Sequence, residues 1–411
     1  MKKTLLALSI LAAGMTAANA AELYNQDGTS FSIDGTVLAN ASFGSSSQDK
    51  SNPYGNTVNV FNGTNDGSSV IDGSYFNFKP TGKSYFNGKD GWYGIGHGYV
   101  RFLEGDTSIR EIWAGIGNDQ YGQLYYGKAY TAWNEVAGHY DLALHYSGMS
   151  YSDPLPFSVQ TRSNNLFKYL GTFDNLSLEF TAVLGNKEGS WLDSNTSNDT
   201  GMTSSFTGGA TYVFGDSGFT GYAAAYYAKL QLNEAKSFAN DGTANAITYN
   251  NKLNIAGGAL GLNYLGDAFG FTLQPMAGKG ITSGNGLYDG NGNSFTSGTD
   301  FTNDTFDTAS FLPVAKANFV SLLSNVSYQI DKTVFVVQYE YGRYSSIDTN
   351  ALGPNYQGSK DQTFSNYIAA NVNYLWNKQF STGVEYGYDL LSKDSAYHVG
   401  SGAWVQAAYD F

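Results

Sequence analysis

The sequence contains no cysteine and only 7 prolines in 411 residues. Without cysteine, neither disulfides nor thiolate-bound metals can stabilise the fold, so stability must come from hydrogen-bonded closure and packing. After a short apolar run near the N-terminus, no stretch approaches the ~18 to 20 consecutive apolar residues that a membrane-spanning helix needs. If the chain lies in a membrane, it must cross it as a barrel of strands.

Basic residues are also scarce, with 22 Lys and Arg against 35 Asp and Glu and a formal net charge of −13. This balance argues against nucleic acid and against an anionic membrane surface as partners. No Gly-x-Ser-x-Gly motif of a serine hydrolase is present. The spacing of the four histidines along the sequence does not match that of a metal site. They are His97, His139, His145 and His398. We therefore expect no enzymatic activity, no metal and no cofactor.

One polar segment follows part of the calcium-loop pattern. Oxygen-bearing side chains occupy its first, third, fifth and twelfth positions, at Asp289, Asn291, Asn293 and Asp300. That loop requires Gly at its sixth position and Glu at its twelfth, whereas this sequence has Ser294 and Asp300 there. We expect an Asn/Gly-rich surface loop, with calcium binding as the alternative.

The first twenty residues have the features of a secretory signal peptide. Met1-Lys2-Lys3 supplies the basic start, an apolar run follows, and Ala18-Asn19-Ala20 matches the small-residue cleavage site. We expect residues 1–20 to be removed and the mature chain to begin at Ala21. That chain has 20 basic against 35 acidic residues, a formal charge of −15.

Glycine (50), tyrosine (32) and phenylalanine (26) are abundant, and apolar residues alternate with polar ones. From Thr29 to Phe43 one face of an extended strand is apolar and the other polar, and the stretch ending at Phe411 repeats the pattern. Such segments number about sixteen, and single-chain bacterial barrels have an even number of strands. We predict one all-β domain over residues 21–411, a transmembrane antiparallel β-barrel, with a bulge or strand end at Pro80 and Pro275.

Several of these segments resemble the general bacterial porin family of Gram-negative outer membranes. Besides the terminal Phe411, the similar stretches are Ala21 to Gly28, Trp113 to Ile116, Gly122 to Lys128 and Gln160 to Tyr169. The resemblance implies a multi-pass barrel whose third loop folds into the lumen. It also implies a homotrimer in outer-membrane lipid, and a water-filled channel for passive diffusion of ions and small hydrophilic solutes.

The sequence departs from that family in two places. The family's Pro-Glu-Phe-Gly-Gly-Asp signature is missing from Ala129 to Phe157. The second loop is reduced to little more than Gly105-Asp106, whereas the family's longer loop latches onto a neighbouring subunit. The resemblance therefore implies a trimer without its usual latch.

By the same resemblance, a basic wall faces acids of the third loop across the narrowest point of the channel. The wall positions are Lys79, Arg101, Lys128 and Arg162, and the loop acids are Glu135, Asp141 and Asp153. The plainer interpretation is that all seven are ordinary charges solvated by the channel or the loop. The excess of acid favours mild cation selectivity.

Aromatic residues in the third loop suggest an alternative function. Sugar rings stack on aromatic faces, so a chitoporin-like, oligosaccharide-specific pore could present a sugar track. Its candidate residues are Tyr130, Trp133, Tyr140 and Tyr146. The competing interpretation is that these aromatics pack or line an interface, as they do in every barrel. A structural or adhesin barrel without conductance is the remaining alternative.

Overall fold

The computed structural model describes residues 21–45, 70–88, 91–103, 106–144, 148–187, 201–232, 235–238, 244–247, 252–282, 315–348, 360–392, 395 and 400–411. The expected signal peptide and the calcium-like segment therefore lie outside the described residues. In these ranges no helix has the length and apolar character required to cross a bilayer.

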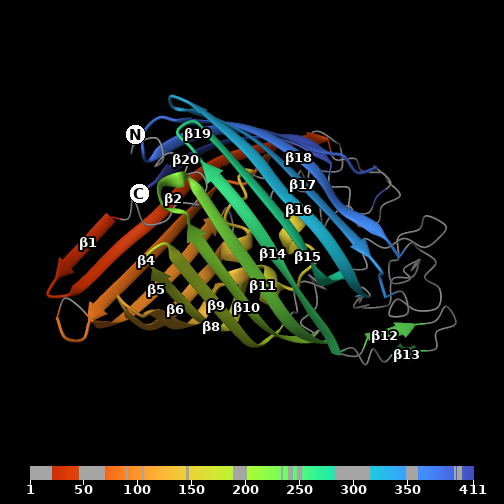
Figure 1. The fold of residues 1–411 in the computed structure, drawn as a ribbon, viewed down its shortest axis with the longest axis horizontal. Helices are drawn as coiled ribbons and strands as arrows, with labels where there is room; N and C mark the ends of the chain where they lie inside the picture. The colour runs from red at the N-terminus through yellow and green to blue at the C-terminus, as the bar shows by residue number, and fades with distance from the viewer. Residues whose placement is uncertain are drawn as a thin grey trace.

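Sixteen antiparallel strands of the described chain close into a barrel, seen from the side in Figure 1. The first eight are β2 (Thr29–Ser45), β4 (Tyr75–Tyr85), β5 (Trp92–Leu103), β6 (Asp106–Asn118), β7 (Gly122–Tyr130), β8 (Arg162–Phe173), β9 (Leu176–Lys187) and β10 (Gly201–Val213). The other eight are β11 (Phe219–Leu232), β14 (Lys252–Leu265), β15 (Phe269–Thr282), β16 (Ala315–Ile330), β17 (Thr333–Ser345), β18 (Gln362–Leu375), β19 (Phe380–Asp389) and β20 (Ser401–Asp410). The all-β barrel predicted from the sequence is confirmed.

A few short elements accompany the barrel. Strands β1 (Ala21–Gln26) and β3 (Val70–Asp72) both pair with β2, while β12 (Ala235–Phe238) and β13 (Ala244–Ile247) form a separate pair. A 3₁₀ turn, η1 (Gly215–Ser217), precedes β11. The described residues between β7 and β8 include three short helices, namely α2 (Ala132–Ala137), α3 (Met149–Ser152) and α4 (Phe157–Gln160).

The two faces of the barrel wall differ in exposure. On β17, Phe335 and Val337 are 41% and 47% exposed, whereas the alternate residues Gln338 and Glu340 are both 1% exposed. We call the face with exposed apolar side chains the outer face and the other the inner face. Strands alternate between the two because successive side chains point to opposite sides.

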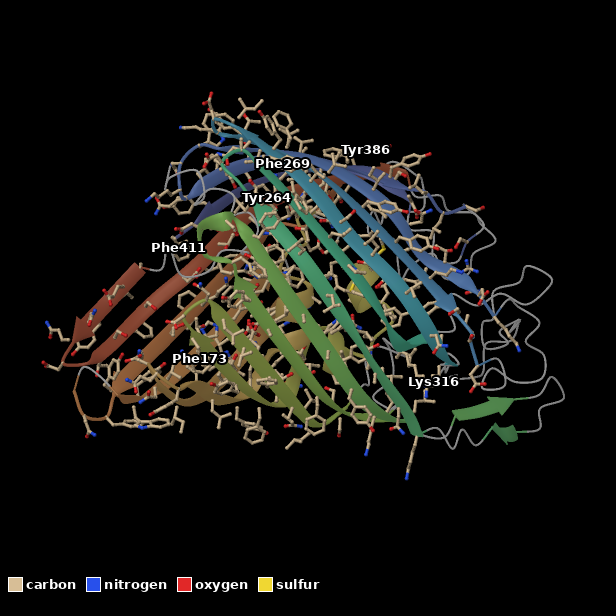
Figure 2. All side chains as sticks on the ribbon, in the orientation of Figure 1. Phe173, Tyr264, Phe269, Lys316, Tyr386 and Phe411 are labelled. Carbon is tan, nitrogen blue, oxygen red and sulfur yellow. The ribbon has the colours of Figure 1, made fainter. Side chains whose placement is uncertain are left out.

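The two ends of the barrel differ as well. Turns of a few residues join strands at one end, for example from β8 to β9 and from β14 to β15, and we call it the short-turn end. Aromatic side chains gather there, and Figure 2 labels Phe173, Tyr264 and Phe269 among them. We call the other rim the long-connection end. In outer-membrane barrels, short turns lie on the periplasmic side and aromatic girdles mark the interfaces.

The two strand prolines do not end their strands. Pro80 pairs with Ile33, and Pro275 pairs with Leu322, each within an uninterrupted register. On its other side, each proline lies in a gap of the strand pairing. Residues 79–80 of β4 have no partner in β5, and residues 274–275 of β15 have no partner in β14. The expected bulge or strand end is therefore wrong, because a proline can stay in a strand where its missing N–H coincides with a gap in the ladder.

The barrel closes between β2 and β20. The backbones of Gly35 and Phe411 exchange two hydrogen bonds, each 3.0 Å, and pairing continues from Thr36 with Asp410 to Ser45 with Ser401. The Phe411 ring stacks on Phe76 at 6.0 Å between centroids. A Cβ atom on Gly35 would lie 2.4 Å from Cζ of Phe411. Only glycine leaves space for this ring.

Gly35→Ala is therefore expected to weaken the closing seam. The methyl group must displace the Phe411 ring or the Asn77 carbonyl, and such overpacking costs about 1 to 3 kcal/mol. The measurement is the temperature at which the purified barrel loses its compact migration on cold SDS gels. Gly82→Ala is the matched control, because the nearest atom to its added Cβ lies 3.8 Å away. Equal loss in both variants would contradict the seam explanation.

Candidate functional site

The connection from β7 to β8, residues 131–161, contains the candidate site, and we call it the bridging segment. It begins at Thr131, whose side chain accepts a hydrogen bond from the Asn134 N–H (3.2 Å) and caps α2. The same hydroxyl donates to the Val159 carbonyl at 2.5 Å, which ties the start of the segment to its end. Gly138 terminates α2. The turn of helix is thus held by a capping threonine, as helix N-termini require.

The bridging segment packs its apolar side chains against the inner face. Trp133 is fully buried, meets Tyr226 of β11 edge-on at 4.9 Å, and donates through Nε1 to the Tyr151 carbonyl at 3.0 Å. Tyr140 is also buried, 4.9 Å from the ring of Tyr222. These residues belong to one buried apolar cluster. They provide packing for the segment and leave almost no surface for a solute.

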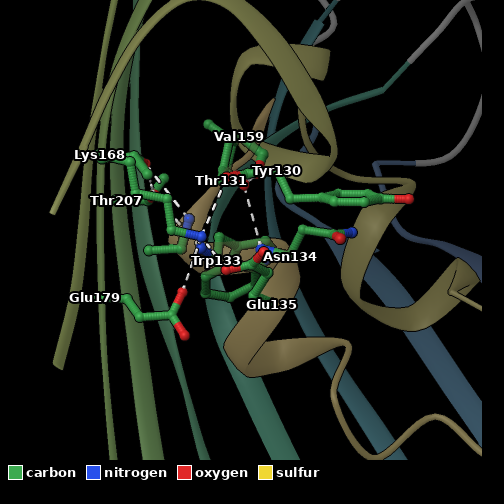
Figure 3. Close-up of polar contacts among 11 residues, drawn as sticks. Tyr130, Thr131, Trp133, Asn134, Glu135, Val159, Lys168, Glu179 and Thr207 are labelled. Atoms are coloured by element: carbon green, nitrogen blue, oxygen red, sulfur yellow. Dashed lines mark hydrogen bonds and ion pairs between the residues drawn. The ribbon is translucent and has the colours of Figure 1, made fainter. Parts of the chain in front are cut away.

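A buried cation holds α2 to the wall. Lys168 of β8 has no exposed side-chain surface and pairs with Glu135 of α2 and with Glu179 of β9, the latter at 3.1 Å (Figure 3). Its ammonium also donates to the Tyr130 carbonyl at 3.4 Å. A charge removed from water needs such partners. Glu135, expected to be a loop acid at the narrowest point, is therefore engaged in an ion pair with the wall.

The far part of the segment is held by carboxylates of other strands. Glu340 of β17 accepts hydrogen bonds from the backbone N–H groups of Gly148 (3.3 Å) and Ser150 (2.8 Å). Glu385 of β19 accepts one from Leu144 at 2.6 Å. Both acids belong to inner faces and both are about 2% exposed or less. We call this pair the acid anchors.

The bridging segment thus contacts the inner face on well-separated strands. Helix α2 packs on β10 and β11, and α3 packs on β16, β17 and β18. The acid anchors extend these contacts to β19. Because the barrel is closed, the segment joins parts of the wall that are distant along the sheet.

Asp141 lies beside one acid anchor. Gln338 of β17 donates to Asp141 Oδ1 at 2.6 Å and to Glu340 Oε1 at 3.0 Å, so two carboxyl groups share one amide. Burial, followed by the negative charge of Glu340, raises the pKa of Asp141 well above its usual value. Burial disfavours the ionised form, and a second carboxylate nearby adds repulsion.

This arrangement gives the anchoring a pH dependence. An acid whose folded-state pKa is raised contributes stability below the pKa of the unfolded state, about 4 for aspartate, and loses it as pH rises through the folded-state value. The heat stability of the barrel is therefore expected to fall as pH rises from about 4. Asp141→Asn keeps the acceptor for Gln338 and should flatten the profile. Asp216→Asn, at an exposed position in η1, is the control and should leave the slope unchanged.

On the opposite part of the wall, three cations lie over tyrosine rings. Arg101 lies 3.9 Å from the ring of Tyr75, Arg162 lies 4.7 Å from Tyr130, and Lys79 lies 5.3 Å from Tyr99. Such stacking holds a cation in place without neutralising it. We call Lys79, Arg101 and Arg162 the basic cluster. It brings together three of the four wall positions expected from the sequence.

The basic cluster is sparsely paired. Lys79 approaches Asp34 at 4.0 Å, whereas no ion pair of Arg101 or Arg162 is found in the part of the chain that the structure describes. Arg101 instead donates to the Asn77 side chain at 3.0 Å and to the Tyr99 hydroxyl at 2.9 Å. The two guanidinium groups therefore keep their charge available.

Lys128, the fourth expected wall position, lies beside this cluster, within electrostatic reach of Arg162 and Arg110. Its register partner is Ile112, which is 59% exposed on the outer face. Its ammonium donates to the Ile109 carbonyl at 2.7 Å. The register of β7 with β8 shifts between Gly127 and Ala129, directly beside this residue. Arg110, which the sequence reasoning missed, lies within electrostatic reach of Arg162 at a bulge in β6.

The remaining predicted residues have different surroundings. Asp153 ends α3 and is exposed. Tyr130 is half-buried, and Tyr146 lies outside the described residues. With Trp133 and Tyr140 buried, the four aromatics do not form a continuous exposed track in the described part of the chain. Nor do the described residues include three or more His, Asp or Glu placed to hold a metal ion.

Known proteins resemble this chain in sequence and in fold. No protein-family model matches it. It is 32% identical over 235 residues to outer membrane protein U of Vibrio vulnificus. This alignment covers 54% of this chain and 61% of that protein. It is 30% identical over 197 residues to porin-like protein L of Photobacterium profundum. This alignment covers 46% of this chain and 53% of that protein. The alignments thus span about half to six-tenths of these relatives.

Solved structures share the fold over almost the whole chain. OmpF of Salmonella typhi, in a complex with daunomycin, has a TM-score of 0.65 at 18% identity and covers 95% of this chain and 100% of that one. The trimer form of OmpT, an outer membrane protein of Vibrio cholerae, has a TM-score of 0.60 at 14% identity and covers 94% of this chain and 100% of that one.

Proposed function

Because the chain belongs to the outer-membrane porins of Gram-negative bacteria, we propose that it forms a water-filled channel for passive diffusion of ions and small hydrophilic solutes. In this proposal the bridging segment lies in the lumen and narrows it. The observation that carries the proposal is the set of contacts between that segment and inner faces from β9 round to β19. No nucleophile or metal is needed for such a function.

The charges beside the bridging segment support a transverse field across the constriction. The basic cluster lies on β4, β5 and the start of β8. The acid anchors and Asp141 lie on the side of β17 and β19. Opposed charges across a narrow aqueous passage orient and select permeating solutes. Only charges that line the passage contribute to this field, because salt screens exposed charges that lie more than a Debye length from the solute.

We also propose mild cation selectivity. The chain carries a net charge of −13, and the inner face and bridging segment include several carboxylates. The basic cluster opposes this preference locally, which limits it to a mild one. Selectivity of this kind follows from the balance of charges along the passage.

Planar-bilayer recording of the purified protein tests the channel directly. We expect discrete conductance steps, and a reversal potential of the cation-selective sign in a KCl gradient. An anion-selective reversal potential would contradict the proposed cation selectivity but would still support the proposed channel. Absence of any conductance step from correctly folded protein would instead favour a structural or adhesin barrel.

The oligosaccharide-specific pore is the weaker proposal. Of its four candidate aromatics, Tyr130 is half-buried and already lies under Arg162, whereas Trp133 and Tyr140 are buried. Micromolar chitooligosaccharide added to the same bilayers is therefore expected to leave the current unblocked. Blockade that Tyr130→Ala abolishes would reverse this ranking.

We further propose a homotrimer. The fold is shared with a protein solved in trimer form, and the family resemblance implies the same assembly. Leu103 pairs with Asp106, so only two residues separate the paired ends of β5 and β6, which leaves little chain for a latch. Analytical ultracentrifugation in detergent should give a mass near three chains, and a single-chain mass would overturn the proposal.

A further inference from the structure

Between the bridging segment and the short-turn end, the inner face contains a pocket of about 560 Å³. Strands β11, β14, β15 and β16 lie side by side there (Figure 1). The turns that join β10 to β11 and β14 to β15 form the rim of the pocket. Its volume is typical of binding sites for small solutes. We call it the turn-end pocket.

The bridging segment closes the turn-end pocket towards the middle of the barrel. Tyr140 is buried there, and His139 meets its ring edge-on at 4.7 Å. Asn325 of β16 donates to the Tyr140 carbonyl at 2.6 Å, and Gln274 of β15 donates to the Ala137 carbonyl at 2.9 Å. These bonds hold the segment against two strands, which leaves the short-turn side as the way in for a solute.

Neutral polar side chains form the wall of the pocket. The register places four of them at the same height on neighbouring strands, namely Thr220, Asn263, Thr272 and Asn325. Neighbouring strands are about 4.8 Å apart, so the row is about 14 Å wide. Thr272 donates to Asn263 Oδ1 at 3.0 Å, and no acceptor for the Asn263 amide N–H groups is found among the described residues. These N–H groups are available to a solute.

One buried hydroxyl group in the pocket has no partner. Ser327 of β16 is 3% exposed, and no hydrogen bond of its side chain is found in the part of the chain that the structure describes. The hydroxyl lies over Gly270 of β15, where an added Cβ would come within 2.6 Å of Ser327 Oγ. Buried polar groups are normally hydrogen-bonded. A bound solute can supply the bond that Ser327 lacks.

Two carboxylates lie at the rim of the pocket without a cation beside them. Asp216 of η1 and Asp267 of the turn from β14 to β15 are both exposed. The described residues that line the pocket include no lysine and no arginine. Within the same ranges neither aspartate has an ion pair or a side-chain hydrogen bond. The way into the pocket therefore carries an unbalanced negative charge.

Turn geometry does not account for these two aspartates. At three other short turns an aspartate has a φ of 50° or 51°, and these residues are Asp27, Asp174 and Asp331. Aspartate and asparagine are favoured at such positions for backbone reasons. Asp216 and Asp267 are not among the residues with positive φ. Their backbone conformation accepts most residue types, and their carboxylates are free to contact a solute.

We propose that the turn-end pocket binds a small polyhydroxylated organic cation. Its ammonium group contacts the carboxylates of Asp216 and Asp267, and its hydroxyl groups bond to Ser327 and to the Asn263 amide. Unpaired carboxylates favour a positively charged ligand, and hydroxyl groups, which both donate and accept, match a neutral polar wall. The pocket lies apart from the basic cluster on β4, β5 and β8. Binding there does not require conductance, so it can fail without failure of the proposed channel.

Ligand-observed NMR on the purified, folded barrel in detergent tests the proposal. Three probes share a six-carbon polyol chain and differ in charge, since D-glucamine is a cation, sorbitol is neutral and gluconate is an anion. Saturation transfer from the protein, followed over a titration, gives a dissociation constant for each probe. We expect D-glucamine to bind about tenfold more tightly than sorbitol, because charge-assisted hydrogen bonds are the stronger ones. Gluconate should not bind. Equal affinity for D-glucamine and sorbitol, or no transfer to D-glucamine, would overturn the proposal.

Asp216→Asn/Asp267→Asn tests the rim of the pocket. This double change should weaken D-glucamine binding about tenfold and bring it to the level of sorbitol. The matched control is Asp27→Asn/Asp174→Asn, which removes the same charge from exposed turns of the same end, outside the pocket lining. It should leave the affinity unchanged. Equal losses in the two double variants would show general attraction to a negative rim, and the proposal would be wrong.

Ser327→Ala tests the wall of the pocket. It should weaken the binding of D-glucamine and of sorbitol by about threefold each, because one neutral hydrogen bond is removed. Ser324→Ala is the control on the same strand, since Ser324 pairs with the outward residue Leu273. All variants are first checked for compact migration on cold SDS gels. Wild-type affinity of a folded Ser327→Ala barrel for both probes would place the solute elsewhere and overturn the assignment.

Discussion

Glu340→Ala/Glu385→Ala is expected to free the bridging segment and to make single-channel currents larger and noisier. The double change removes the acceptors of three backbone N–H groups, those of Leu144, Gly148 and Ser150. A buried donor left without a partner costs about 1 to 3 kcal/mol. The loss of three is thus comparable to the whole net stability of many small domains. Conductance and current noise are measured in planar bilayers.

The matched control for this prediction keeps the hydrogen bonds and removes the charge. Glu340→Gln/Glu385→Gln retains a carbonyl oxygen at both positions, so the segment should remain in place and the noise should stay low. If the glutamine variant also gives larger and noisier currents, the negative charge of the two acids rather than their hydrogen bonds holds the segment. If the alanine variant shows wild-type conductance, the acid anchors do not control the passage.

Arg101→Gln/Arg162→Gln is expected to raise the cation preference of the channel by about threefold to tenfold. These guanidinium groups face no ion-pair partner among the described residues, so their charge acts on permeating ions. Charges lining a cleft with low-dielectric walls change local ion concentrations by about tenfold or more. The ratio of potassium to chloride permeability follows from reversal potentials in a KCl gradient.

A change of net charge alone must be separated from a change inside the passage. Lys332→Gln/Lys378→Gln also removes two positive charges, but at exposed positions of the short-turn end. Its permeability ratio should match that of the wild type at 0.1 M salt, where the Debye length is about 10 Å. An equal shift in both double variants would show that the basic cluster does not line the passage.

The strands could be predicted closely from the sequence, because alternation records the difference between the two faces of the wall. The segment Thr29 to Phe43 became β2 (Thr29–Ser45), and Gly122 to Lys128 became β7 (Gly122–Tyr130). Outward residues in a membrane barrel must be apolar and inward ones need not be. That rule is local, so it needs no knowledge of the partner strand.

The site was harder to predict because its contacts join distant positions. Thr131 and Gly138 are recognisable helix caps, but α2 is short and its stability depends on Tyr226 and Lys168 in other strands. Glu340 could have been noticed as a charged residue on an inner face. Nothing local reveals that it accepts hydrogen bonds from Ser150, 190 positions away along the chain.

One error has a physical origin that lies outside the strand itself. The prolines were expected to disturb their strands, but each lies where the ladder already has a gap. The outcome depends on the pairing partner, which one strand's sequence does not contain.

The seam between Gly35 and Phe411 also affects the order in which the strands can pair and the chain entropy lost at each pairing. Every pairing around the ring, except that of β2 with β20, joins strands that follow each other along the chain. Neighbouring hairpins can therefore form one after another at small loop-closure cost. Among the strand pairings only the seam joins distant parts of the chain, so the strand contacts with the largest sequence separation form there. An intermediate complete in every hairpin would still have two free edges until this seam closes.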